Sequence, residues 1–208
     1  MPHEFRDARE VVKYLAKRRN TLSRWFLERT DVDRIPYDAV GANTFRAFHH
    51  LPQRPCDVFR GWANRAIRDD NAVRPILTAR SQSEFDEYVR RFSERLRRAW
   101  RTQQGQVLAY GPSRKLPNLL LKHYARYERL SNGERTRLIE HLHVPLDSFT
   151  LIGIRNCVNE PRIPRNASMS YVQDEVVYNS IQAAIRDVAH RAEVPAIYFD
   201  VLAWNMGH

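Results

Sequence analysis

Cysteine and glycine are both scarce in this sequence. The two cysteines among 208 residues, Cys56 and Cys157, form no CxxC pair and no Cys/His cluster. This spacing excludes the ligand sets typical of structural zinc and iron–sulfur sites, so we expect neither a metal nor another cofactor. Only seven glycines occur, and apolar residues recur mostly at helical spacing. These features favour a helical protein without a metal centre.

Long apolar stretches are also missing. No segment approaches the roughly 18 apolar residues that a membrane-spanning helix requires. The opening sequence from Met1 to Phe5 lacks the basic region and the apolar region of a signal peptide. We therefore expect a cytoplasmic protein without a membrane partner. We also expect it to be a monomer.

Lysine is rare although the chain is strongly basic. The net charge is +10, and only four of the 34 basic residues are lysines, at Lys13, Lys17, Lys115 and Lys122. An excess of arginine favours a polyanionic partner such as a nucleic acid, although a generally basic soluble protein is the simpler alternative. Codon bias could explain the arginines. It would leave each lysine as a candidate for chemistry that arginine cannot perform.

The apolar spacing predicts an all-α fold. We expect one helical domain over residues 1–208, either as a single bundle or as two lobes with the active site between them. The predicted helices are 4–29, 43–50, 55–69, 82–103, 115–129, 132–142, 147–157, 171–192 and 195–206.

The helix predicted at 82–103 has the clearest pattern. Ser81 and Glu84 have the spacing of a capping box, and an apolar stripe that includes Phe85 follows them. The opposite face carries six arginines, at Arg90, Arg91, Arg95, Arg97, Arg98 and Arg101. Such a face is usually only solvated, and direct contact with DNA is the alternative hypothesis.

Two short segments could carry chemistry. Residues 111–115, read as Gly-Pro-Ser-Arg-Lys, have the composition of a tight turn that opens a helix. Residues 144–150 contain a proline followed by Asp147, which stands where a helix N-cap would stand. Each segment has a structural alternative, because Lys115 could be a solvated lysine and Asp147 could be only a cap.

Together these segments resemble the helix–hairpin–helix DNA glycosylase superfamily, most closely its archaeal 8-oxoguanine DNA glycosylase branch. That branch has a Gly-containing basic hairpin, a lysine, an apolar helix, and then Ile/Val-Pro-x-Asp before another helix. Here Lys115 and Asp147 are 32 residues apart, as in that branch, and Lys122 also matches. The resemblance implies that Lys115 and Asp147 are catalytic. It also implies that the hairpin, through Gly111, Ser113 and Arg114, contacts the DNA backbone.

The C-terminal segment adds a third match. Residues 193–204 resemble the ending Gly-Ile-Pro-Pro-x-x-Leu-Asp-x-x-x-Trp of the same family. The resemblance implies that Asp200 and Trp204, one helical turn apart, line a pocket for an extruded base. Phe85 is assigned to the position where the archaeal enzymes have a pocket tryptophan. The resemblance covers roughly residues 81–208, and the departures outside the motifs leave the target base open.

The chemistry of base excision calls for these residue types. A carboxylate near C1′ stabilises the positive charge that develops on the sugar, and it can accept a proton from the nucleophile. A neutral lysine amine can attack C1′ and form a Schiff base, which arginine cannot do. The target base must leave the duplex, and an aromatic ring can stack on it.

The sequence therefore predicts a DNA N-glycosylase acting on double-stranded DNA that contains a modified base. Abasic-site lyase activity would accompany it if Lys115 forms the Schiff base. The substrate is either an oxidised purine, in DNA repair, or a modified base of foreign (phage) DNA, in antiviral defence. The alternatives are a catalytically inactive helical DNA-binding protein on the same scaffold and, less favoured, an interaction module that does not bind DNA. Bound to DNA, the protein would associate with the nucleoid.

Overall fold

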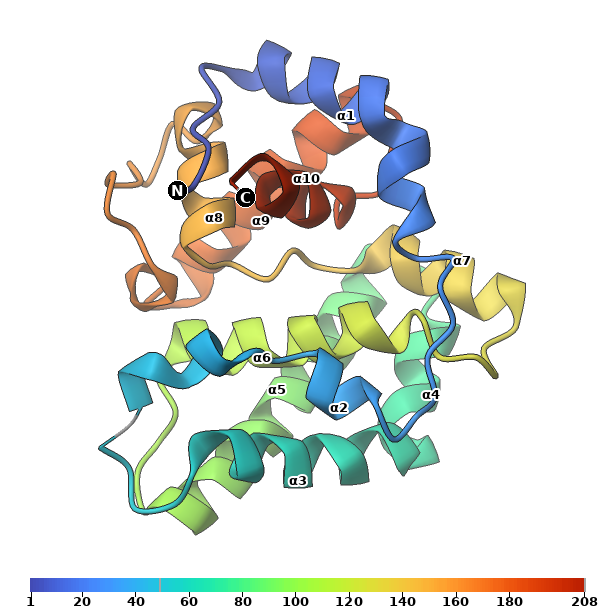
Figure 1. The fold of residues 1–208 in the computed structure, drawn as a ribbon, viewed down its shortest axis with the longest axis vertical. Coiled ribbons are helices and arrows are strands. Elements are labelled where there is room, and N and C mark those ends of the chain that lie inside the picture. Colours follow the sequence, from blue (N-terminus) through green and yellow to red (C-terminus); the bar gives the residue numbers. More distant parts are fainter. Residues whose placement is uncertain (49, 208) are drawn as a thin grey trace. The chain divides into compact units, whose positions relative to one another are not determined.

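The computed structural model describes residues 1–48 and 50–207. All regular secondary structure within these ranges is helical, apart from a single isolated bridge between Thr30 and Tyr127. The prediction of an all-α fold is therefore confirmed. The chain forms two compact units (Figure 1). The first contains residues 1–28, 109–115 and 142–208, and the second contains residues 29–108 and 116–141.

The first unit is built around the C-terminal helix. Its elements are α1 (Ala8–Arg24), the start of α6 (Tyr110–Tyr124), α8 (Ser148–Ile154), η2 (Arg155–Cys157), η3 (Met169–Tyr171), α9 (Glu175–Arg191) and α10 (Tyr198–Gly207). Helix α10 packs against α1, α8 and α9 (Figure 1). Its fully buried Phe199 lies 6.2 Å from the Phe5 ring, measured between centroids, and Tyr198 stacks on Phe26 at 5.5 Å. Burial of these rings supplies much of the core's hydrophobic stabilisation.

The second unit has an aromatic core. Its elements are α2 (Ile35–Asp38), η1 (Ala42–Phe48), α3 (Pro55–Arg68), α4 (Asp70–Thr78), α5 (Gln82–Gln104), the rest of α6, and α7 (Asn132–His141). Helix α5 packs against α3 and α4, and α4 also packs against α7 (Figure 1). The rings of Trp62 on α3 and Phe92 on α5 meet edge to face at 5.1 Å. Trp100 is buried beside Phe45.

Helix α5 agrees best with its prediction. The Ser81 hydroxyl caps it by accepting from the Glu84 amide, and Gly105 ends it in the left-handed conformation at φ 71°. Gly105 is suited to this position because it has no side chain to clash there. The buried residues Phe85, Val89, Phe92, Leu96 and Trp100 form the predicted stripe.

Several predicted boundaries were wrong. Helix α6 begins at Tyr110 rather than at Lys115, so residues 111–114 belong to its first turns and not to a separate tight turn. Pro112 fits there because the first turn of a helix needs no proline N–H. Helix α4 was missed, since Pro75 within it interrupts the apparent pattern. The segment predicted at 43–50 is a 3-10 helix over Ala42–Phe48, and His49 lies outside the described residues. Within residues 1–48 and 50–207, no helix is long and apolar enough to cross a membrane.

Candidate active site

Asp147 is the N-cap of α8, as its position after Pro145 suggested. Its Oδ1 accepts hydrogen bonds from the backbone amides of Phe149, at 3.0 Å, and Thr150, at 3.2 Å. The Thr150 hydroxyl in turn accepts from the Asp147 amide at 2.8 Å, which completes a capping box. Asp147 is 7% exposed and Thr150 is fully buried. This cap fixes the orientation of the carboxylate and commits one of its oxygens to the helix.

Lys115 faces the other carboxylate oxygen. Its Nζ lies 3.5 Å from Oδ2 of Asp147, and the two side chains are 11% and 10% exposed. Both residues belong to the first unit, and the boundary with the second unit falls directly after Lys115 within α6. A lysine and a carboxylate held this close, mostly away from water, attract each other much more strongly than a surface pair. The structure thus brings together the two residues predicted to be catalytic.

A buried glutamine holds the segment that leads to Asp147. The Gln182 side chain on α9 accepts from the Val144 amide at 3.1 Å and donates to the Val144 carbonyl at 2.7 Å. Gln182 is 1% exposed. The Gln182 amide therefore satisfies the backbone N–H and C=O of Val144, which would otherwise be buried without hydrogen-bond partners. Sequence reasoning missed Gln182, because nothing local to it indicates a partner 38 positions away. Thr150 could have been found from the Asp-x-x-Thr spacing of a capping box.

The predicted DNA-backbone residues lie inside the first unit. Gly111 lies so close to η3 that a Cβ added to it would fall 1.9 Å from the Met169 carbonyl oxygen. Ser113 is 1% exposed, and its hydroxyl donates to the Tyr110 carbonyl. Arg114 is 4% exposed, with its guanidinium 4.6 Å from the centre of the Tyr178 ring. These positions support packing roles for the three residues, and their contact with DNA remains a prediction.

Arg114, the residue before Lys115, belongs to a cluster that also contains Tyr110, Tyr178 and His143. The Tyr178 hydroxyl lies 2.7 Å from Nδ1 of His143, which is 2% exposed. The Tyr110 ring meets the Tyr178 ring edge to face at 6.2 Å. Arg114 and Tyr178 therefore join the start of α6 to α9, and this contact positions the helix that carries Lys115.

The two C-terminal residues of the predicted pocket differ in exposure. Trp204 is 38% exposed, and its ring stacks on Phe149 at 4.5 Å with an angle of 21° between the planes. Since the Phe149 amide donates to Asp147, this stack lies next to the turn that Asp147 caps. Asp200, one turn earlier on α10, is fully buried.

Phe85 belongs to the second unit, unlike the other predicted pocket residues. It is fully buried in the α5 stripe, and its ring centre lies 5.8 Å from that of His141. Its assignment to a base pocket remains a prediction.

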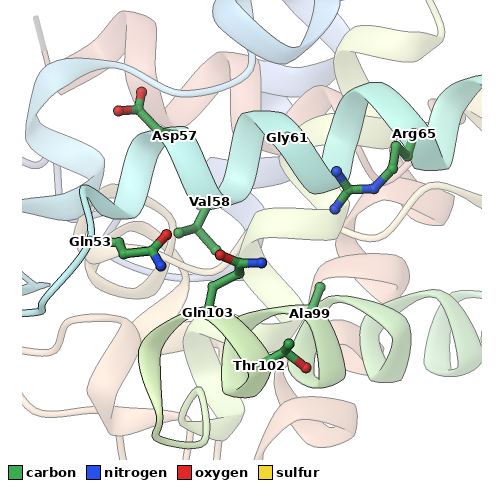
Figure 2. Close-up of a pocket in the computed structure, with 8 residues that line it drawn as sticks. All are labelled: Gln53, Asp57, Val58, Gly61, Arg65, Ala99, Thr102 and Gln103. Carbon is green, nitrogen blue, oxygen red and sulfur yellow. The ribbon is translucent and has the colours of Figure 1, made fainter.

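The second unit also contains a hollow of about 350 Å³ between α3 and α5 (Figure 2). Two small residues, Gly61 and Ala99, are among those that line it. Figure 2 shows the Arg65 guanidinium directed toward the gap between the helices and the Asp57 carboxylate directed away from it. The residues lining this hollow include none of the predicted site residues.

Among residues 1–48 and 50–207, no three His, Cys, Asp or Glu side chains are grouped to hold a metal ion. Comparison with protein-family models, with curated proteins and with solved structures finds no match to this chain.

Proposed function

We propose that this protein is a DNA N-glycosylase that removes a modified base and uses Lys115 and Asp147 as its catalytic pair. The observation that carries the proposal is the 3.5 Å separation of Lys115 Nζ from Asp147 Oδ2 within one compact unit. The pair has the residue types and the chain order of the helix–hairpin–helix glycosylases that the sequence resembles.

Asp147 has two separable roles in the proposed reaction. Oδ1 is held by the amides that begin α8, so the carboxylate does not need to reorganise when charge develops on the sugar. Oδ2 faces Lys115 and is the oxygen that can accept a proton from the attacking amine.

Lys115 supplies the nucleophile. Its nitrogen forms a bond to C1′ while the N-glycosidic bond breaks, and the bonding electron pair leaves with the base, which then takes up a proton. The proton released by the amine passes to Asp147. Opening of the sugar ring gives the Schiff base from which β-elimination can nick the strand. The proposed substrate is an oxidised purine or a modified base of foreign DNA, and the residues of the catalytic pair do not distinguish between them.

The test is release of free bases from duplex DNA. A panel of duplexes, each with one modified base, is incubated with the protein, and released bases are identified by mass spectrometry. Wild type should release a base from at least one duplex, and Asp147→Asn should release none. Asparagine is as good an N-cap as aspartate, so α8 should remain folded in this variant.

The matched control is Asp187→Asn, at an exposed aspartate that forms a surface ion pair with Arg191. This control should release bases at the wild-type rate. DNA binding by wild type without release from any duplex would instead favour the inactive DNA-binding protein. Absence of both activities would favour an interaction module of another kind.

A further inference from the structure

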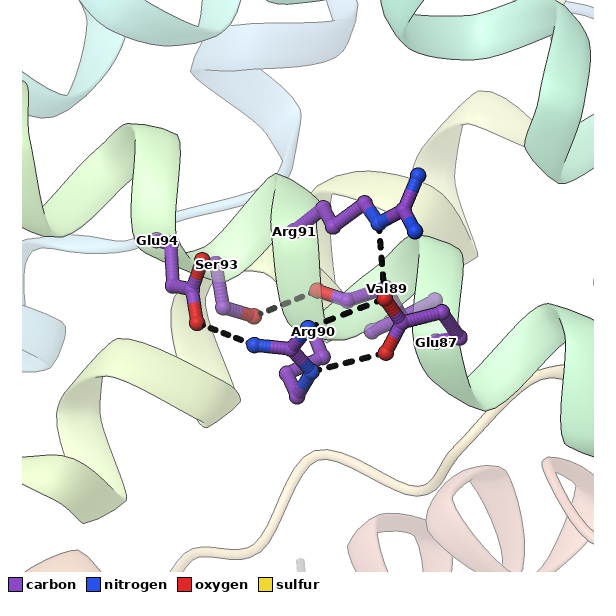
Figure 3. A network of polar contacts seen from close by, with 6 residues as sticks. All are labelled: Glu87, Val89, Arg90, Arg91, Ser93 and Glu94. Carbon is purple, nitrogen blue, oxygen red and sulfur yellow. Dashed lines mark hydrogen bonds and ion pairs between the residues drawn. The ribbon is translucent and has the colours of Figure 1, made fainter.

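The arginine-rich face of α5 is divided into two parts with different partners. In the first part, Glu87 accepts hydrogen bonds from Arg90 at 2.8 Å and from Arg91 at 2.7 Å (Figure 3). Glu94 also pairs with Arg90 (Figure 3). Arg95 pairs with Asp69, from the connection before α4, at 3.0 Å. The acidic neighbours therefore offset the charge of the first three arginines.

The last two turns of α5 carry three more arginines, and the acidic residue beside them, Glu94, pairs with Arg90. Arg97, Arg98 and Arg101 line an open hollow of about 360 Å³ together with Val107 and Glu94. In the described part of the chain, none of these three arginines forms an ion pair, whereas Glu94 already pairs with Arg90. The hollow therefore has three available guanidinium groups within about one helical turn.

A phosphate is the ligand chemistry that suits this group. Guanidinium forms paired, charge-assisted hydrogen bonds to phosphate oxygens, and neighbouring guanidiniums can hold one phosphate or two. The simpler structural role is to complement the negative end of the helix dipole, because Arg101 lies in the last turn of α5. That role predicts a loss of stability on substitution but no change in DNA binding.

We propose that Arg97, Arg98 and Arg101 form a binding site for the phosphates of the DNA backbone, and that the paired arginines of α5 do not. The proposal rests on the proposed function for its partner and names where the second unit would contact the DNA. The hollow is open to solvent, and the chain has a net charge of +10. Both features favour an extended polyanion such as DNA over a small anion bound in a closed pocket.

The test compares two triple variants with the same change in net charge. The site variant is Arg97→Gln, Arg98→Gln and Arg101→Gln. The control is Arg74→Gln, Arg91→Gln and Arg95→Gln, which removes three arginines of the same unit that pair with Asp70, Glu87 and Asp69. Binding to an unmodified duplex is measured by fluorescence anisotropy over a series of salt concentrations.

Each phosphate contact contributes about 0.9 to the slope of log affinity against log salt concentration, so the site variant should lose roughly 2 to 3 from that slope. Its affinity at low salt should fall by at least about 10-fold, as expected when several phosphate contacts are lost. The control should keep the wild-type slope. A further variant with lysine at positions 97, 98 and 101 should recover most of the affinity, since lysine keeps the charge.

Equal losses in both triple variants would overturn the proposal, because net charge alone would then explain the binding. Wild-type binding by the site variant would overturn it as well, and a drop in its melting temperature would then support the dipole role. Base release is measured separately on the modified duplexes. Loss of binding in the site variant without base release by wild type would support the phosphate site and contradict the glycosylase. Base release by wild type, together with unchanged DNA binding by the site variant, would support the glycosylase and contradict the phosphate site.

Discussion

The amine of Lys115 and the carboxylate of Asp147 lie 3.5 Å apart, although 32 positions separate them in the sequence. Two different long-range contacts bring them there. The Arg114–Tyr178 contact positions the start of α6, and the Gln182 bonds to Val144 position the segment before α8. The placement of Lys115 beside Asp147 therefore depends on α9, which supplies both Tyr178 and Gln182.

Lys115→Gln should abolish trapping of the protein on DNA by borohydride and should abolish strand nicking. The reason is that the amide cannot form a Schiff base, whereas water can partly replace the amine in bond breaking. Some base release should therefore remain. Trapping is measured as a covalent protein–DNA band, and nicking is measured on the same duplex.

Two controls separate charge from chemistry. Lys115→Arg keeps the charge beside Asp147 but should not be trapped, and Lys17→Gln at an exposed position should behave as wild type. Duplex affinity should change only modestly in all three variants, because many arginines remain. A wild-type protein that releases a base but is never trapped would be a monofunctional glycosylase, with Lys115 as a positioning residue.

Trp204→Ala and Asp200→Ala should impair base removal more than they impair DNA affinity. Stacking of a base on an aromatic ring is worth about 1–3 kcal/mol, so loss of the Trp204 ring should slow release about 5- to 150-fold. Trp204→Phe should keep much of the rate, because it can still stack on Phe149.

Since Asp200 is fully buried, Asp200→Asn is the better comparison for that residue. It keeps the size of the side chain and removes the charge. Normal excision by folded Trp204→Ala and Asp200→Asn variants would show that this segment only packs the core of the first unit.

Gly61→Ala and Gly111→Ala should change stability in opposite directions. A Cβ at Gly61 in α3 meets only Arg65 Nη1, at 3.8 Å, so alanine should stabilise the helix by about 0.5–1 kcal/mol. A Cβ at Gly111 would fall 1.9 Å from the Met169 carbonyl oxygen and 2.9 Å from that of Val172. Because backbone must move to make room, we expect a loss of roughly 1–3 kcal/mol.

Thermal unfolding measures both glycine effects. The Gly61→Ala protein should melt about 1–4 °C higher than wild type, given the usual scaling for a chain of this size. A Gly111→Ala protein that is as stable as wild type would contradict the close approach of α6 to η3.

His123 should make the protein less stable as pH falls below neutrality. Burial, with smaller contributions from Lys122 and Arg126, lowers its pKa from 6.5 to about 3. Between these two values the unfolded chain binds a proton that the folded chain does not, so the free energy of unfolding decreases as pH is lowered. The slope from one such group is at most about 1.4 kcal/mol per pH unit.

Urea unfolding at pH 7 and pH 5 tests this prediction. His123→Gln cannot titrate and should show a smaller difference in unfolding free energy between the two pH values than wild type. The range stays above pH 4.5, where the carboxyl groups with lowered pKa values, such as Glu134 and Glu87, begin to contribute. An unchanged difference in the variant would assign the pH dependence to other groups.

Local patterns in the sequence were sufficient for much of the helical structure. The Ser81 cap, the apolar stripe from Phe85 to Trp100, and the Asp147 cap all depend on residues within a few positions of one another. Glu87 lies three and four positions before Arg90 and Arg91 on one helix, so these ion pairs could also be predicted from the sequence. Such features follow from short-range hydrogen bonds and side-chain spacing, which can be recognised in the sequence.

Tertiary packing decided the features that join distant parts of the chain. Helix α6 begins at Tyr110 while Gly111 packs against the Met169 carbonyl, and Arg95 is neutralised by Asp69 from another element. The likeness to glycosylases, rather than any spacing rule, suggested that Lys115 and Asp147 act together. Their separation depends on how α6, α8 and α9 pack in the first unit, and long-range packing of this kind leaves no periodic pattern in the sequence.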